Sequence, residues 1–279
     1  MASLDLATTP TTGALPTTPG PTRRPPRPAR RNPLRLLRRW VSPVVLLGLW
    51  QALSSAGVID ERTIASPAQI FTRAVELVQD GTLGSATLTS LQRVGIGFAI
   101  GAAIGMTLAI VAGLSRIGED AIDPPMQMLR TLPHFGLIPL FILWFGIGEQ
   151  PKITLIAMGV TFPLYLNTFA GIRNIDRKTI EAARAMNLTW VQRVRHVIVP
   201  GALPQTLTGL RQSLGIAWLS LIVAETISAS SGLGYMINNA RDFLQTDVIV
   251  VGLAVYSLLG LATDGIVRYL EGRALAWRS

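Results

Sequence analysis

Few side chains in this sequence could carry out covalent or metal chemistry. The chain has no cysteine and two histidines, His134 and His196. We therefore expect no thiolate nucleophile, no cysteine-ligated metal and no histidine-built metal site within one chain. The two lysines, Lys152 and Lys178, do not follow a glycine, so neither fits the G-x-x-x-x-G-K-S/T loop that binds the phosphates of ATP. We expect no catalytic residue and no bound metal or cofactor on this chain.

The composition is that of a membrane protein. Hydrophobic residues make up 49% of the 279 residues, charged residues only 15%, and the mean hydropathy is +0.42. A soluble globular domain carries about 25% charged residues, so this chain lacks the polar surface that a cytosolic enzyme of its length would need. The same high apolar content excludes a disordered chain.

Six apolar segments are predicted to cross the membrane. They lie at about residues 43–59, 92–114, 126–148, 153–172, 212–231 and 248–265. Several are shorter than the roughly 20 residues that a spanning helix needs, and prolines such as Pro133 and Pro163 interrupt them. Because neighbouring helices must shield the freed backbone groups, we expect residues 41–279 to form one all-α, six-helix transmembrane bundle.

Residues 1–40 are rich in proline, threonine and arginine, and they are expected to form a disordered basic tail. The basic region is longer than that of a signal peptide, so the first apolar segment is interpreted as an uncleaved span. Arginine and lysine are concentrated in the segments on one side of the predicted membrane, which places both termini in the cytoplasm. The tail is interpreted as a topology anchor that also binds anionic membrane lipid, and no nucleic acid is expected as a partner.

The longest predicted cytoplasmic loop, residues 173–211, has the pattern of two helices joined by a sharp turn. Residues 181–186 are strong helix formers whose small alanines would let a partner approach closely. Asn187 accepts the left-handed conformation that ends a helix. Residues 189–192 form a capping box for a second helix, which we expect to end at Pro200.

This loop resembles the EAA loop of the membrane subunits of ABC importers. The family pattern is EAA, three residues, glycine, nine residues, and then Ile-x-Leu-Pro. The matching positions here are Glu181, Ala182, Ala183, Asn187 in place of the glycine, Val197, Val199 and Pro200. Asparagine also tolerates a left-handed backbone, so we expect the turn to be retained.

A longer stretch, about residues 85–278, is similar to permeases of the nitrate/sulfonate/taurine type. The similarity is carried by residues 132–134, 138–148, 209–211, 215–218, 224–227 and 230–235. The sequence around His134 most resembles the aliphatic-sulfonate permeases.

The resemblance implies the type I ABC importer permease fold with a cytoplasmic coupling-helix loop, in a bacterial plasma (inner) membrane. Two copies of the chain would form the pathway, two separate subunits would bind and hydrolyse ATP with magnesium, and an extracytoplasmic solute-binding protein would deliver the substrate. That substrate would be a small organic anion, an aliphatic sulfonate, with taurine, nitrate or a vitamin precursor as alternatives. The residues implied in coupling to the ATPase are Glu181, Ala182, Ala183, Arg184, Asn187, Val197, Val199 and Pro200.

Two residues inside predicted spans are candidates for lining or gating the pathway. A charge at the position of Glu225 costs about 3 kcal/mol on insertion scales, so its carboxylate must face a cavity or a partner. Pairing with Arg93, Arg130 or a backbone group is an equal alternative. His134 could donate a hydrogen bond to a sulfonate, or it could be a hydrogen-bonded packing residue.

Two other classes of protein remain as distant alternatives. A passive channel would not need the two-helix cytoplasmic loop. An intramembrane enzyme would need a nucleophile–base pair or metal ligands at membrane depth, which the spans do not offer. Within the second span, Gly97, Gly101 and Gly105 share one helix face and predict close packing against another helix, of the same chain or, as the alternative, of a second subunit.

Overall fold

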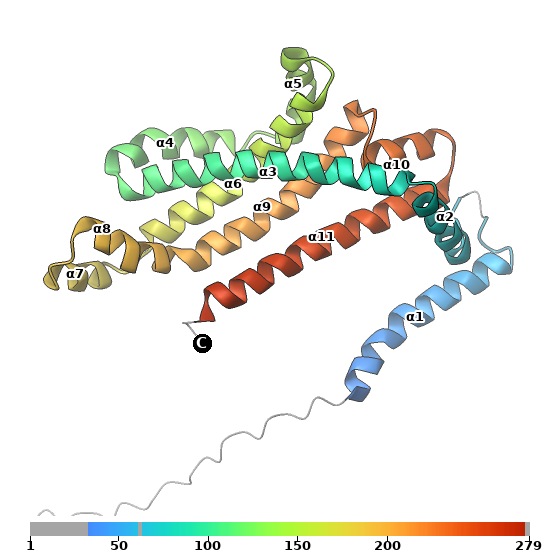
Figure 1. Cartoon of the computed structure of the whole chain (residues 1–279), viewed down its shortest axis with the longest axis horizontal. Helices are drawn as coiled ribbons and strands as arrows, with labels where there is room; N and C mark the ends of the chain where they lie inside the picture. The colour runs from blue at the N-terminus through green and yellow to red at the C-terminus, as the bar shows by residue number, and fades with distance from the viewer. Residues whose placement is uncertain (1–32, 61–62, 277–279) are drawn as a thin grey trace, which may run out of the picture. The chain divides into compact units, whose positions relative to one another are not determined.

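The computed structural model describes residues 33–60 and 63–276, with side chains from residue 41 onward. All regular structure in these ranges is helical (Figure 1). The elements are α1 (Pro33–Ser55), α2 (Pro67–Gln79), α3 (Thr82–Leu114), α4 (Arg116–Leu129), the 3-10 helix η1 (His134–Leu137), α5 (Ile138–Phe145), α6 (Glu149–Arg173), α7 (Arg177–Ala185), α8 (Trp190–Arg193), the π-helical turn η2 (Val194–Ile198), α9 (Val199–Ser228), α10 (Leu233–Asp242) and α11 (Thr246–Ala274).

The chain divides into two units, Met1–Leu46 and Leu47–Ser279. The described part of the first unit is the beginning of α1, which starts at Pro33, inside the segment predicted to be a tail. Residues 1–32 of that predicted tail lie outside the described residues. The second unit holds the rest of α1 and all the other described helices, including those of the predicted coupling loop.

Four described helices are long and apolar enough to cross a membrane: α3, α6, the continuous helix Trp190–Ser228 and α11. They cover the predicted spans at residues 92–114, 153–172, 212–231 and 248–265. The pair Arg116–Leu129 and His134–Phe145 counts as a fifth if it is taken as one broken span, and Val41–Ser55 is a shorter apolar helix. That the chain crosses the membrane six times therefore stays a prediction.

The predicted span 126–148 is not one straight helix. Its two halves meet at an angle of 84° across a short break that contains Pro133. Proline has no backbone N–H and disfavours the helical conformation of the residue before it, so the helix stops before Pro133 and restarts in a new direction.

Local capping signals set where the connecting helices begin. The Ser66 hydroxyl accepts the Gln69 N–H, the Gln69 side chain accepts the Ser66 N–H at 2.9 Å, and Pro67 opens α2. The Ser115 hydroxyl accepts the Gly118 N–H at 3.2 Å and so starts α4 directly after α3 ends. These caps fix the residues at which α2 and α4 begin.

The glycine face of α3 packs against α6, as predicted for contact within the chain. Gly97, Gly101 and Gly105 are all buried. A β-carbon at Gly101 would overlap the carbonyl oxygen of Ala157, and one at Gly105 would lie 2.7 Å from the carbonyl oxygen of Thr161. The two backbones can approach this closely only because the three positions lack side chains.

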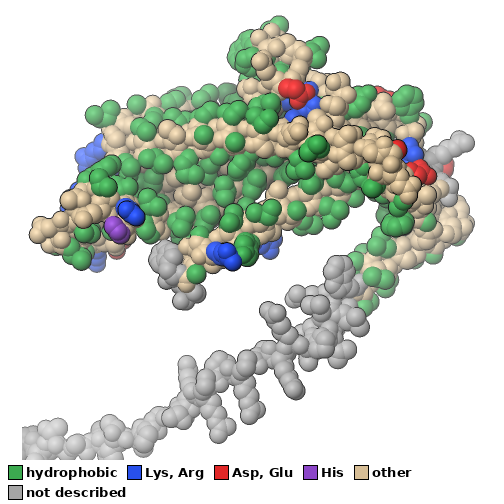
Figure 2. Space-filling model, in the orientation of Figure 1, with side chains coloured by type: hydrophobic (Ala, Val, Ile, Leu, Met, Phe, Trp, Pro, Cys, Tyr) green, Lys and Arg blue, Asp and Glu red, His purple; other side chains and the backbone are tan. Residues whose placement is uncertain are grey.

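Helix α6 lies between α3 and α9 and is the most enclosed of the four long helices (Figure 1). Of its most apolar segment 56% is buried, against 17% for α11. Figure 2 shows hydrophobic side chains spread across the whole face in view, with charged side chains gathered in a few small groups. The outer helices thus present an apolar surface, while α6 forms the centre of the bundle.

Candidate functional site

Two charged regions lie at opposite ends of α6. Its 25 residues make it about 37 Å long, with Glu149 in its first turn and Arg173 in its last. The predicted coupling loop follows Arg173, and α7 and α8 lie at that end of the bundle (Figure 1). A cluster of buried ionic side chains surrounds Glu225 at the other end.

The turn in the loop has the geometry predicted for Asn187. This residue is left-handed, with φ +57°. The Asn187 N–H donates to the Arg184 carbonyl at 2.9 Å and the Leu188 N–H donates to the Ala183 carbonyl at 3.1 Å. These bonds satisfy carbonyl groups at the end of α7, so asparagine performs the role of the helix-ending glycine.

The second helix of the loop begins as predicted but does not end at Pro200. The capping box of Thr189 and Gln192 is present at the start of α8. The chain then passes through the π-helical turn Val194–Ile198, where the Val199 N–H donates to the Val194 carbonyl, and continues directly into α9. The prediction of a stop was wrong because proline is tolerated in a first helical turn, and the wider π turn lets α9 start just before Pro200.

The residues of the EAA pattern differ in exposure. Ala183 is 4% exposed and packs inward, whereas Glu181 and Arg184 lie on the surface and form no ion pair in the described part of the chain. Among the residues predicted to couple to the ATPase, two are half-buried, Val197 and Pro200. The exposed ones are Glu181, Ala182, Arg184, Asn187 and Val199. A charged surface is thus available for a partner at this end of the bundle.

A basic cavity of about 620 Å³ lies beneath the loop, where α3 and α6 end. Its charged lining residues are Arg116, Arg173, Arg177, Arg184, Arg193 and Glu181. Of these, Arg173 forms an ion pair with Glu119. Since arginines outnumber acidic groups here, the cavity favours an anionic side chain or headgroup.

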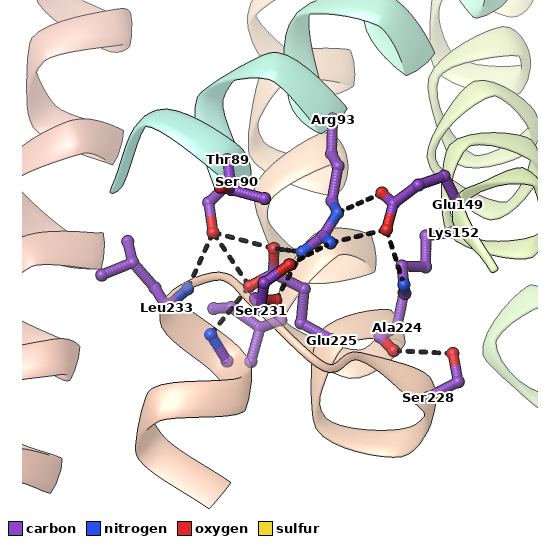
Figure 3. Close-up of polar contacts among 12 residues, drawn as sticks. Thr89, Ser90, Arg93, Glu149, Lys152, Ala224, Glu225, Ser228, Ser231 and Leu233 are labelled. Carbon is purple, nitrogen blue, oxygen red and sulfur yellow. Dashed lines mark hydrogen bonds and ion pairs between the residues drawn. The ribbon is translucent and has the colours of Figure 1, made fainter. Parts of the chain in front are cut away.

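Glu225 is buried in a complete set of hydrogen-bond donors (Figure 3). Its carboxylate accepts from Arg93 Nη1 at 2.6 Å, the Ser90 hydroxyl at 2.8 Å, the Gly234 N–H at 2.7 Å and the Tyr256 hydroxyl at 2.8 Å. Of the alternatives open from sequence, the structure shows pairing with Arg93 and a backbone group. A buried carboxylate is stable only with such partners, and these leave no free face for a solute.

Arg93 lies between Glu225 and a second carboxylate, Glu149 (Figure 3). Its Nε and Nη2 donate to the two Glu149 oxygens at 2.5 Å and 2.7 Å, a bidentate pair. Lys152 donates to Glu149 Oε1 at 3.0 Å. The Arg93 and Lys152 side chains are 3% and 2% exposed, whereas that of Glu149 is 53% exposed.

The segment between α9 and α10 closes over this cluster. Gly232 has φ +101°, and a β-carbon there would overlap Glu225 Oε1 and lie 2.6 Å from Arg93 Nη1. A β-carbon at Gly234 would lie 2.5 Å from the Glu225 Cβ. The neighbouring Ser231 accepts from Arg93 through its carbonyl oxygen at 2.7 Å. Glycine at both positions is therefore what lets the backbone reach the ion pair.

His134 is separate from the charged cluster. It lies half-buried in η1 and contacts the Phe135 ring, with ring centroids 4.0 Å apart and the ring planes tilted by 44°. The His134 Nε2 and the Ser220 hydroxyl are both buried, and neither has a hydrogen-bond partner among the described residues. Both atoms lie within 3.5 Å of the point where a β-carbon at Gly159 would be. The structure does not bring His134 and Glu225 into a common hydrogen-bond network.

Sequence reasoning missed Glu149 as a partner of Arg93 and Lys152 as a second partner of Glu149. Glu149 and Lys152 are three positions apart in the first turns of α6, and Lys152 is one of only two lysines in the sequence. That lysine at the edge of an apolar segment was the available signal. Among the described residues, no group of histidine and acidic side chains is placed to hold a metal ion.

Residues 101–275 match the family described as binding-protein-dependent transport system inner membrane component. The putative aliphatic sulfonates transport permease protein SsuC of Escherichia coli is 49% identical over 238 residues, 85% of this chain and 90% of that protein. SsuC of Bacillus subtilis is 44% identical over 254 residues, covering 90% and 92%. The taurine transport system permease protein TauC of E. coli is 33% identical over 238 residues, covering 84% and 86%.

Two solved structures share the fold. An amino acid ABC transporter crystallised with histidines has a TM-score of 0.60 at 18% identity, covering 71% of this chain and 97% of that one. The inward-facing MetNI methionine ABC transporter has a TM-score of 0.52 at 22% identity, covering 68% and 97%. At these identities the likeness shows the fold alone, and that fold is the permease fold of type I ABC importers.

Proposed function

This chain belongs to the family of binding-protein-dependent transport system inner membrane components and is an ABC importer permease subunit, and we propose that it imports aliphatic sulfonates. The proposal rests on similarity, which is higher to sulfonate permeases than to a taurine permease over most of the chain. Taurine, itself a sulfonate, and nitrate are the alternatives in the same class.

We further propose that residues 173–211 couple the chain to a separate ATPase subunit. The observation that carries this proposal is the exposed edge formed by Glu181, Ala182 and Arg184 at one end of the bundle, above a basic cavity. Buried Ala183 and left-handed Asn187 hold that edge in place. A short, firmly anchored helix with free charges is suited to docking in a cleft of a partner and to transmitting its movement.

The proposed coupling role of residues 173–211 also orients the bundle in a bacterial inner membrane. With the loop and both termini in the cytoplasm, the Arg93–Glu225 cluster lies at the extracytoplasmic end. Two copies of the chain would then enclose the path, with a solute-binding protein docking on the extracytoplasmic side. ATP and magnesium would be bound by the ATPase subunits.

Coupling is tested by co-purification. A tagged chain is extracted from membranes of its own bacterium, and the ATPase that accompanies it is quantified for the wild type, a Glu181→Ala plus Ala182→Asp variant and a Glu76→Ala control. Both substituted regions are exposed, so neither variant should unfold, and Glu76 lies in α2 at the other end. We expect the ATPase to be lost only from the loop variant; equal recovery in all three would refute the coupling role.

The substrate is tested by uptake in a strain that lacks the chain and is complemented with it. Radiolabelled butane-1-sulfonate should accumulate when ATP is available, and unlabelled alkanesulfonates should compete better than taurine or nitrate. Stronger competition by taurine or nitrate would assign the chain to that sibling substrate.

A further inference from the structure

We propose that Arg93 and Lys152 form an anion-binding site at the extracytoplasmic end of the bundle, which the Glu149 carboxylate occupies in this structure and which a sulfonate group takes over during import. This inference rests on the proposed function, because it needs an organic anion as the transported solute. It assigns a binding role to residues that coupling to an ATPase does not require.

The two carboxylates of the cluster are held in different ways. Glu225 is fully buried and accepts hydrogen bonds from Ser90, Gly234 and Tyr256 in addition to Arg93. Glu149 is held by the two cations alone and is half in water. Glu225 is therefore a fixed counter-ion, and Glu149 is the anion that can leave.

The donors around Glu149 suit an oxyanion with three oxygens. Arg93 Nε, Arg93 Nη2 and Lys152 Nζ lie 2.5 Å, 2.7 Å and 3.0 Å from the carboxylate oxygens and approach from two helices, α3 and α6 (Figure 3). A guanidinium fork together with an ammonium group gives a sulfonate three charge-assisted bonds, one for each oxygen. A carboxylate has only two oxygens for these three donors, and here Oε1 accepts from both cations.

Charge balance explains why a tethered anion occupies the site. Two cations face two carboxylates, so the cluster is neutral. Losing one anion would leave a buried cation without a counter-charge, which is strongly unfavourable. Exchange of Glu149 for a monovalent sulfonate keeps the cluster neutral throughout, and Glu149 restores neutrality once the solute has moved on.

The exposure of Glu149 provides the route of exchange. Its side chain is the only exposed member of the ion network formed by the described residues Arg93, Glu149, Lys152 and Glu225. A rotation of this side chain into water uncovers the donors of both cations without moving a helix. The site is thus accessible from the side on which the binding protein would release its solute.

The test measures anion binding to the purified full chain by its thermal stability. The ligands are butane-1-sulfonate, the neutral isostere butane-1-sulfonamide and chloride, compared at constant ionic strength with gluconate as the balancing anion. The variants are Glu149→Gln, which removes the competing charge, and Glu149→Asp, which keeps it. A Glu149→Gln plus Lys152→Met variant removes one of the donors.

We expect Glu149→Gln to bind butane-1-sulfonate at least tenfold more tightly than the wild type or Glu149→Asp, because the tethered competitor is gone. The sulfonamide should not stabilise any variant, and the added Lys152→Met change should abolish the gain. Unchanged affinity in Glu149→Gln, or equal stabilisation by chloride, would overturn the proposal and leave a structural ion pair.

Uptake by the complete transporter separates this inference from the proposed function. If the wild type imports butane-1-sulfonate but Glu149→Gln gains no affinity for it, the anion site is refuted and the proposed function stands. If the wild type imports no sulfonate, the proposed function is refuted, whatever the variant binds. In the expected case Glu149→Gln lowers KM and also lowers kcat, since tighter binding slows release; a purely structural ion pair would reduce only the amount of transporter.

Discussion

Replacing Glu225 with glutamine should be among the most destabilising single changes in the chain. The two carboxylate oxygens face four donors, from Arg93, Ser90, Gly234 and Tyr256. In glutamine an NH2 group replaces one of the two oxygens. Because both oxygens of Glu225 accept hydrogen bonds, this NH2 group would face hydrogen-bond donors in either orientation of the amide. Arg93 and Lys152 would also share the single remaining carboxylate of Glu149.

The magnitude can be worked out from the burial of both partners. The Arg93 and Glu225 side chains are 3% and 0% exposed. Breaking a buried pair by neutralising one partner costs about 3–5 kcal/mol of unfolding free energy. At roughly 2–4 °C per kcal/mol for a domain of this size, the Tm should fall by about 6–20 °C.

The assay heats the purified full chain in detergent and measures the fraction that remains monodisperse by gel filtration. Glu76→Gln is the matched control, because it makes the same chemical change in an exposed pair with Arg73. Exposed pairs contribute about 0–1 kcal/mol, so its Tm should stay close to that of the wild type. A Glu225→Gln variant as stable as this control would refute the view that the cluster holds α3, α9 and α10 together.

Three further outcomes are expected. Gly101→Leu should lower the unfolding free energy by about 1–3 kcal/mol or more, and with it the Tm, because the new side chain would overlap the Ala157 carbonyl. An unchanged melting curve would contradict the α3–α6 contact. Asn187→Gly should keep ATPase co-purification, whereas Asn187→Val should reduce it, since a β-branched residue at φ +57° is strained by about 1–2 kcal/mol; equal recovery for both would contradict the role of the turn. Because the chain has no cysteine, Met186→Cys should react with a membrane-impermeant maleimide only from the cytoplasmic side and Asp242→Cys only from the other; the reverse would invert the topology.

Local features of the sequence predicted local features of the fold. The apolar runs marked the long helices because a helix exposed to lipid must be apolar along its whole length. Asn187 and the capping box at Thr189 could be interpreted because each acts on backbone groups within a few residues. The spacing of Gly97, Gly101 and Gly105 predicted close packing, although the partner helix α6 could not be identified from spacing alone.

Features that depend on distant contacts could be predicted only in part. A buried charge needs a partner, so Arg93 could be named as one of the alternatives for Glu225, but the two residues are 132 positions apart and no periodicity selects that pair. Glu149, 56 positions from Arg93, was missed. The expected stop at Pro200 failed because a π turn, which has no clear sequence signal, precedes it. The glycines at 232 and 234 were noted as part of a family motif, but their reason, close approach to the Glu225 carboxylate, is visible only once the helices are assembled.

The packing of α3 on α6 explains how events at one end of the bundle can reach the other. A β-carbon at Gly97 would lie 2.7 Å from the Ile156 side chain, and one at Gly113 would lie 2.9 Å from that of Ile172. The two helices therefore interlock along most of their length, and neither can slide past the other without a clash, since packed interfaces deform in discrete steps rather than continuously. A shift imposed beside Ile172, where the basic cavity meets the loop, must carry the α3–α6 pair as one body. That same pair bears Arg93 and Glu149 at its other end, so the proposed docking of an ATPase at the loop would be mechanically linked to the geometry of the ion cluster.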